Sequence, residues 1–133
     1  MQISSAVVTR DADTCWRIFT DVGLLTSWVP GLRRAQVIAK EHGLPSEIHF
    51  EFSSSLAYTL VYRYDREQGE VHWTPKLGKR EGVSGFVRFE SDGEATRVTY
   101  GLEQGDRRNA AERALSDPEP LLVAFAAWLH DAR

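Results

Sequence analysis

The stretch that decides the fold is Ser46–Asp65, with the sequence SEIHFEFSSSLAYTLVYRYD, in which two alternating segments flank three serines. In the first segment Ile48, Phe50 and Phe52 alternate with Glu47, His49 and Glu51. Alternation with period two is the pattern of a strand that buries one face. A link as short as Ser53–Ser55 permits an antiparallel hairpin and leaves no room for a parallel crossover.

The same alternation continues on both sides of this stretch. It predicts strands at residues 34–41, 46–53, 57–65, 70–76, 83–90 and 95–103. Residues 2–10 are rich in Val, Ile, Ser and Thr, which predicts a first strand there. Short turn-like segments such as His42-Gly43 and Asp92-Gly93 separate consecutive strands. The sequence therefore predicts an antiparallel meander, joined by the N-terminal strand.

Helical spacing appears at two places outside the meander. After Asp11 and Asp13, which are both suitable N-caps, the residues Cys15, Ile18, Phe19 and Val22 follow at intervals of three and four. A second short helix over 24–28 ends before Pro30-Gly31. Near the C-terminus, Asp117 and Pro118 predict the start of a helix of about fourteen residues. Its apolar face comprises Leu121, Leu122, Phe125, Trp128 and Leu129. Residues 109–115 are predicted to form a further helical piece.

Composition excludes several classes of protein. The 133 residues suit one domain, 1–133, and the net charge of -3 provides no positive surface for nucleic acid. The N-terminus lacks a signal-peptide pattern, and no apolar stretch is long enough to span a membrane. The one cysteine, Cys15, fits a buried position in a reducing compartment, so we expect a cytoplasmic protein. The scattered histidines predict no metal site, and no nucleotide or cofactor motif is present.

The order of these elements resembles that of a known superfamily. The resemblance is carried by residues 13–21, DTCWRIFTD, then by Trp28-Val29-Pro30-Gly31, and by later strands at 70–73, 85–90 and 95–100. These segments resemble the START-like (SRPBCC) superfamily, which contains polyketide cyclase/dehydrase proteins, lipid-transport proteins and Bet v 1-like proteins. The resemblance spans nearly the whole chain.

The resemblance implies an α+β helix-grip fold. In this fold a curved seven-stranded antiparallel sheet wraps around the C-terminal helix, with two short helices between strands 1 and 2. It also implies a cavity for a hydrophobic ligand between the sheet and the last helix. Since Pro118 and Pro120 shorten that helix, segment 106–117 is predicted to act as a flap at the cavity mouth.

The candidate ligand-binding residues are the large side chains on the expected inner faces. They are Trp28, Phe50, Tyr58, Tyr62, Trp73, Val87, Phe89, Tyr100, Phe125 and Trp128. The orientation of strand 57–65 stays open. A three-residue loop places Tyr58 and Tyr62 on the side of Phe50, whereas a loop of two or four residues turns Arg63 inward.

Three functions remain in consideration. The first is binding or transport of a small hydrophobic molecule by a monomer or homodimer. The second is an enzyme that resembles polyketide aromatase/cyclases and works without metal, with Arg63, Tyr62, Tyr58 or His49 as its titratable groups. The third is a protein-interaction module resembling activators of a chaperone ATPase, which predicts a filled interior. We assign no catalytic residue and no cofactor.

Overall fold

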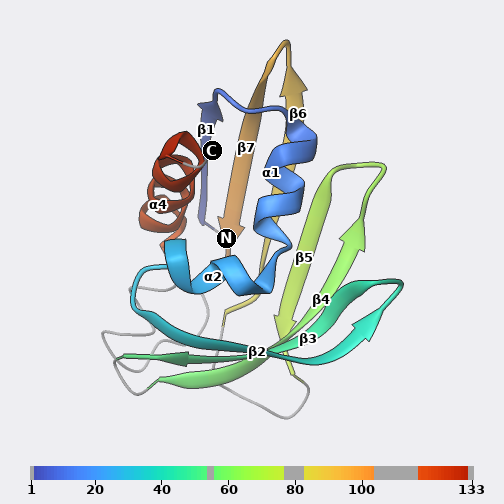
Figure 1. Ribbon diagram of the computed structural model, residues 1–133, viewed down its shortest axis with the longest axis vertical. Helices are drawn as coiled ribbons and strands as arrows, with labels where there is room; N and C mark the ends of the chain where they lie inside the picture. Colours follow the sequence, from blue (N-terminus) through green and yellow to red (C-terminus); the bar gives the residue numbers. More distant parts are fainter. Residues whose placement is uncertain (1, 54–55, 77–82, 104–116, 132–133) are drawn as a thin grey trace.

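The computed structural model describes residues 2–53, 56–76, 83–103 and 117–131 (Figure 1). The elements in this part are β1 (Gln2–Val8), α1 (Ala12–Phe19), α2 (Val22–Trp28), β2 (Leu32–Glu41), β3 (Leu44–Phe52), β4 (Ala57–Asp65), β5 (Glu70–Pro75), β6 (Gly85–Asp92), β7 (Ala95–Leu102) and α4 (Pro118–Asp131). The predicted helical piece 109–115, and all of the predicted flap 106–117 except Asp117, lie outside the described residues.

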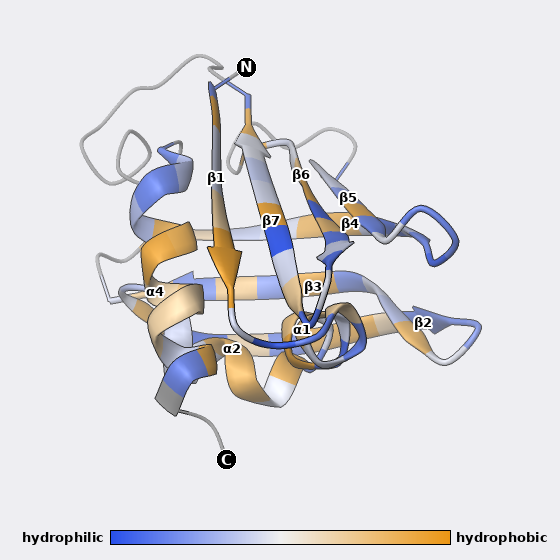
Figure 2. Cartoon of the chain, turned by 90° about the horizontal axis from the view of Figure 1, so that it is seen from above, coloured by the Kyte–Doolittle hydropathy of each residue, from blue (hydrophilic) through white to orange (hydrophobic). Residues whose placement is uncertain are grey.

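The described strands form one antiparallel sheet of seven strands in the order β1-β7-β6-β5-β4-β3-β2. All three described helices lie on one side of this curved sheet, with α4 beside β1 and α2 beside β2 (Figure 1). Hydrophobic and hydrophilic residues alternate along the strands (Figure 2). The predicted helix-grip fold is therefore confirmed. No helix in the described ranges is long and apolar enough to cross a membrane.

Some strand boundaries differ from the prediction. Strand β1 ends at Val8 rather than at residue 10, because Thr9 and Arg10 lead into α1. The carbonyl oxygen of Arg10 accepts a hydrogen bond from the Thr96 hydroxyl at 2.7 Å, which ties this connection to β7. Strand β6 is shifted by two residues toward the C-terminus, and Gly93 adopts a φ of 66° in the turn that follows it.

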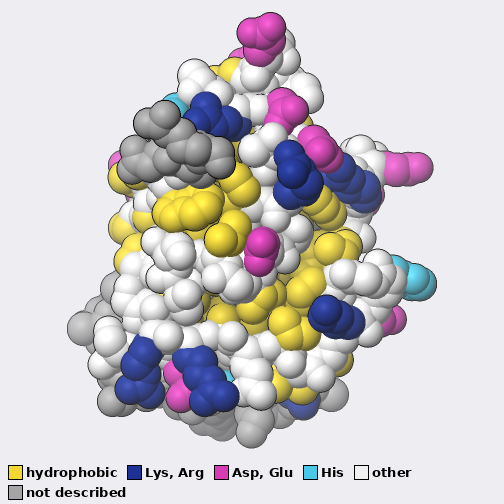
Figure 3. Space-filling model, viewed as in Figure 1, with side chains coloured by type: hydrophobic (Ala, Val, Ile, Leu, Met, Phe, Trp, Pro, Cys, Tyr) yellow, Lys and Arg dark blue, Asp and Glu magenta, His cyan; other side chains and the backbone are white. Residues whose placement is uncertain are grey.

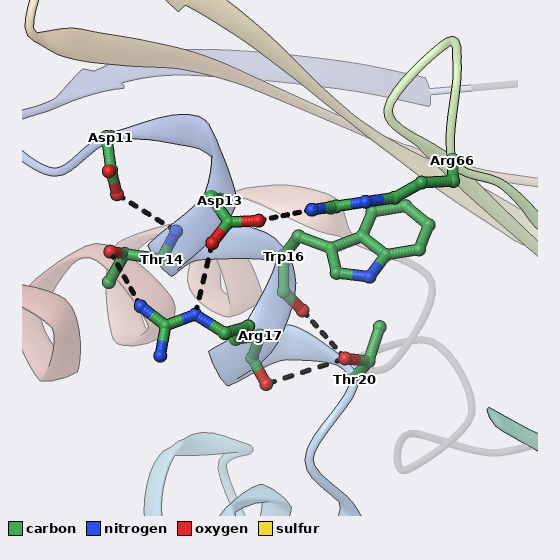
Figure 4. Close-up of polar contacts among 7 residues, drawn as sticks. All are labelled: Asp11, Asp13, Thr14, Trp16, Arg17, Thr20 and Arg66. Carbon is green, nitrogen blue, oxygen red and sulfur yellow. Dashed lines mark hydrogen bonds and ion pairs between the residues drawn. The ribbon is translucent and has the colours of Figure 1, made fainter. Parts of the chain in front are cut away.

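Polar contacts hold α1 in place over the sheet (Figure 4). The Asp11 carboxylate accepts a hydrogen bond from the Thr14 backbone N–H at 2.9 Å, and hydrogen bonding to Thr14 lowers the pKa of Asp11. The guanidinium of Arg66, from the turn after β4, lies 4.8 Å from the ring centre of Trp16 and pairs with Asp13. These contacts help to hold α1 against the sheet. Phe19, the last residue of this helix, is buried in the core.

The C-terminal helix begins as its sequence predicts. The Asp117 carboxylate accepts a hydrogen bond from the Glu119 N–H at 3.1 Å, and the helix runs for 14 residues from Pro118. Phe125 and Leu129 have no exposed surface, whereas Trp128 is only partly buried. The helix therefore packs through a narrow apolar stripe.

Gly69→Ala is expected to destabilise the fold far more than Gly93→Ala. Both glycines have nearly the same positive φ, 67° and 66°, so backbone strain is matched in the two variants. A Cβ at residue 69 would lie 2.6 Å from the Phe89 carbonyl oxygen, whereas one at residue 93 meets nothing within 4 Å. We expect a loss of about 1 kcal/mol for Gly93→Ala and roughly 2 kcal/mol more for Gly69→Ala. Urea denaturation measures both, and equal losses would contradict the steric argument.

Candidate functional site

A cavity lies between the α1–α2 pair and the concave face of the sheet. The volume of the cavity is about 70 Å³. Since a cavity needs about 15 Å³ to hold one water, this space is large enough for about five waters. Hydrophobic side chains gather in the middle of the face that carries the helices, and charged side chains lie mostly around them (Figure 3).

Six of the ten predicted residues line this cavity. They are Trp28, Phe50, Tyr58, Tyr62, Trp73 and Tyr100. Val87, Phe89, Phe125 and Trp128 are not among the lining residues. The ring of Phe125 lies 4.9 Å from that of Trp28 and 6.1 Å from that of Phe89, so it fills the space between α4 and the sheet. The cavity consequently lies mainly under α2, and α4 contributes one described lining residue, Leu121.

The register of β3 and β4 determines which side of β4 faces the cavity. Phe50 is paired with Tyr58, and the Phe52 N–H donates to the Leu56 carbonyl at 2.8 Å. Three residues therefore separate the paired ends, which is the alternative that turns the tyrosines inward. Arg63 lies on the opposite face and is exposed. The cavity is lined by tyrosines and not by this cation.

Two important lining residues were missing from the predicted set. Phe19 is surrounded by other aromatic rings, and Tyr64 lies beside Tyr62 with their ring centres 6.2 Å apart. The sequence pattern contained enough information to place both residues on an inner face. Phe19 belongs to the apolar stripe of the first helix, and Tyr64 has the same parity as Tyr62 along its strand. The sequence could not show that α1 ends directly above the cavity.

Two polar lining residues already have hydrogen-bond partners. The Tyr64 hydroxyl donates to the Pro45 carbonyl at 2.7 Å, and the Thr20 hydroxyl donates to the Trp16 carbonyl at 2.8 Å. The indole nitrogen of Trp28 is enclosed and has no partner within the described residues. Its ring instead packs edge-to-face against Phe125.

Three tyrosine hydroxyls remain available in the cavity. Tyr58, Tyr62 and Tyr100 all line it, and none has a hydrogen-bond partner among the residues that the structure describes. Burial raises the pKa of each phenol, and for Tyr62 the proximity of Tyr100, Tyr58 and Tyr64 raises the pKa further. These groups are therefore protonated at neutral pH and can donate hydrogen bonds.

The candidate residue His49 lies with Glu47 and Glu51 on the face of β3 that points away from the cavity. Glu47 pairs with Lys76 at 2.9 Å, and Glu51 lies 3.5 Å from the guanidinium of Arg33. The Nδ1 atom of His49 is 2.9 Å from the Thr59 hydroxyl. As the alternation indicates, this is a solvated outer face, so His49 and Arg63 are not positioned to act on a molecule in the cavity.

No family model matches the chain, and no curated protein matches it either. Several solved structures are similar to the chain. A START superfamily protein from Mycobacterium smegmatis aligns over 98% of this chain and 97% of its own, with 13% identity and a TM-score of 0.77. A STAR-related lipid transfer protein from Xanthomonas axonopodis aligns over 96% and 84%, with 16% identity and a TM-score of 0.67.

A third similar structure is a di-domain protein. StfQ, a di-domain ARO/CYC from the steffimycin biosynthetic pathway, aligns over 100% of this chain with 14% identity and a TM-score of 0.75. The chain spans 46% of StfQ, so the likeness covers about half of that protein. At sequence identities of 13% to 16%, the similarity of these structures shows a shared fold and no more. The chain shares with these proteins the helix-grip fold that its sequence predicts.

Proposed function

We propose that this protein binds or carries a small hydrophobic ligand in the cavity under α2. The observation that carries the proposal is the apolar, aromatic-walled space itself, because protein interiors are close-packed and contain few voids larger than a water molecule. Ligand sites are typically concave and apolar with a few polar groups, and this cavity has that character. Free, buried Cys15 is compatible with the cytoplasmic location that we also propose.

The volume of the cavity favours a compact ligand. A space of about 70 Å³ is smaller than the cavity of about 150 Å³ that holds benzene in an engineered core, so we expect a compact ring rather than an extended acyl chain, with the cavity walls moving apart on binding. Burial of such a molecule would provide affinity at about 25 cal/mol per Å² of apolar surface removed from water. The lipid-transfer protein among the similar structures supports binding of a hydrophobic molecule on this fold.

An aromatase/cyclase-like enzyme is the second candidate. It is favoured by the likeness to the ARO/CYC protein StfQ and by the tyrosine hydroxyls in the cavity. With His49 and Arg63 on the outer face, the tyrosines are the remaining titratable groups of the predicted set. The cavity favours both candidates over an interaction module with a filled interior.

Native mass spectrometry of the protein purified from its own host tests the proposal. We expect an added mass of a small hydrophobic compound that is lost on denaturation. A carrier releases this compound unchanged, whereas an enzyme converts it on incubation, and chromatography of the released fraction distinguishes the two. Protein that carries no compound and binds none of a panel of small hydrophobic molecules would contradict ligand binding.

Leu60→Trp is expected to weaken ligand binding strongly without unfolding the protein. Leu60 lies on the inner face of β4 and lines the cavity, so the larger indole would occupy the space of the ligand. We expect affinity to fall by at least about tenfold, the equivalent of about 1.4 kcal/mol. Calorimetric titration with naphthalene measures the change.

The matched control is Val61→Trp, which places the same side chain on the opposite face of the same strand. Val61 is not a lining residue of the cavity and pairs with Glu47 and Thr74. Affinity should be unchanged in this variant. Equal losses in the two variants would argue against the cavity as the binding site.

A further inference from the structure

We propose that the cavity selects an uncharged aromatic ligand bearing an oxygen that accepts a hydrogen bond from one or two of the hydroxyls of Tyr58, Tyr62 and Tyr100, and that it rejects carboxylates. This inference rests on the proposed function and adds the chemical class of the ligand. It goes beyond hydrophobic burial, which by itself does not distinguish a phenol or ketone from a hydrocarbon or a fatty acid.

The first argument is the hydrogen bonding of the lining residues. Buried polar groups normally have partners, and the hydroxyls of Tyr64 and Thr20 are satisfied by backbone carbonyls. Those of Tyr58, Tyr62 and Tyr100 have no partner within the described part of the chain. A ligand oxygen would supply the missing partner, so these hydroxyls would favour an oxygen-bearing ligand over a hydrocarbon.

The second argument is that the three tyrosines, which come from β4 and β7, line one and the same cavity. The pKa of Tyr62 is raised in part by the proximity of Tyr58 and Tyr100, since neighbouring phenolates would repel each other. The pKa of Tyr100 is also raised in part by Tyr58. A ligand that fills this cavity therefore meets hydroxyl donors from two strands, and an oxygen with its two lone pairs can accept from them.

The third argument is the absence of charge. None of the described residues that line the cavity is charged, and Arg63 lies on the far side of β4. A carboxylate would lose its hydration on entry without meeting a cation, which is strongly unfavourable. The same desolvation raises the pKa of the tyrosines in this space.

The fourth argument concerns the shape of the ligand. The rings of Phe50 and Tyr58 lie 5.8 Å apart, and those of Tyr62 and Trp73 lie at the same distance. Flat aromatic walls of this kind favour aromatic ligands, which stack or pack edge-on against them. A ring carrying a hydroxyl or carbonyl oxygen matches both the walls and the tyrosine hydroxyls.

Isothermal titration calorimetry at neutral pH with naphthalene, 2-naphthol and 2-naphthoate tests this inference. The three probes share one ring system and differ in the polar group. We expect 2-naphthol to bind about tenfold more tightly than naphthalene and 2-naphthoate to bind at least about a hundredfold more weakly than 2-naphthol. Binding of 2-naphthoate as tightly as 2-naphthol would overturn the inference while leaving hydrophobic binding intact.

The combined variant Tyr58→Phe, Tyr62→Phe and Tyr100→Phe removes the hydroxyls and keeps the rings. We expect it to lose the tenfold preference for 2-naphthol over naphthalene, while far-ultraviolet circular dichroism shows that it is folded. An unchanged preference would overturn the role of the tyrosines. Arg63→Gln is the control, and it should leave the discrimination against 2-naphthoate unchanged because Arg63 lies outside the cavity. Failure of all three probes to bind the unmodified protein would overturn both the inference and the proposed function.

Discussion

Phe19→Ala is expected to lower the free energy of unfolding by about 4 kcal/mol, a large share of the stability of a typical domain. Phe19 is 7% exposed and is the last residue of α1. Removal of a buried phenyl group loses its transfer free energy and leaves a void that the surrounding residues fill only in part. In this protein the void would enlarge the neighbouring cavity.

The expected loss is large because Phe19 connects several elements. Its ring centre lies 5.7 to 6.1 Å from five others, those of Trp28, Trp73, Phe89, Tyr100 and Phe125. These rings belong to α2, β5, β6, β7 and α4. One side chain thus contacts the second helix, the C-terminal helix and the middle of the sheet, so its removal weakens the packing among all of them.

Phe86→Ala is the matched control for this prediction. Phe86 is partly buried on the outer face of β6, where it stacks on His72 with the ring centres 5.8 Å apart. We expect a loss of about 1 kcal/mol, since little buried contact is removed and no internal cavity forms. Urea denaturation of both variants measures the difference. A loss for Phe19→Ala no greater than that for Phe86→Ala would contradict the central position of Phe19 in the core.

The tyrosines are expected to remain protonated until the protein unfolds at alkaline pH. The chain contains four tyrosines, and burial raises the pKa of every one of them, Tyr58, Tyr62, Tyr64 and Tyr100, above the ordinary value of 10.0. At pH 10.0 an ordinary tyrosine is half ionised, whereas the folded protein should show almost no phenolate absorbance.

This shift makes stability depend on alkaline pH. Because the pKa of each tyrosine is higher in the folded state than in the unfolded state, the unfolded chain releases protons first as the pH rises. Below pH 10.0, the pKa of an ordinary tyrosine, ionisation of the tyrosines does not lower the free energy of unfolding. Above this pH the free energy of unfolding falls progressively, because the unfolded chain ionises first. We therefore expect cooperative alkaline unfolding in which ionisation and loss of structure coincide.

Phenolate absorbance and far-ultraviolet circular dichroism, followed over the same titration, test this expectation. The two transitions should superimpose, and the protein in concentrated urea should titrate near pH 10.0 as a control. Ionisation of two or more tyrosines while the circular dichroism is still native would show that the cavity is hydrated and would contradict the burial described above.

The sequence by itself determined the fold class and the order of the elements. The alternation over strands 57–65 and 95–103 predicts β4 and β7 to within one residue, and Asp117-Pro118 predicts the start of α4. These features are local, because capping, turn formation and one-sided burial depend on residues close together in the chain. The assignment of Phe50 to the interior followed from the same pattern.

Only the tertiary structure decided which of these buried residues surround a cavity. The sequence left open whether Arg63 or the tyrosines face inward, because a change of one residue in the loop reverses the face of the whole strand. It also could not separate Phe125, which fills the core, from Tyr62, which lines the cavity, since both are aromatic residues on inner faces. That difference depends on how α2 and α4 pack against the sheet, which is a sum of contacts between distant segments. Local periodicity shows that a side chain is buried, and only the packing of all the elements shows whether empty space lies next to it.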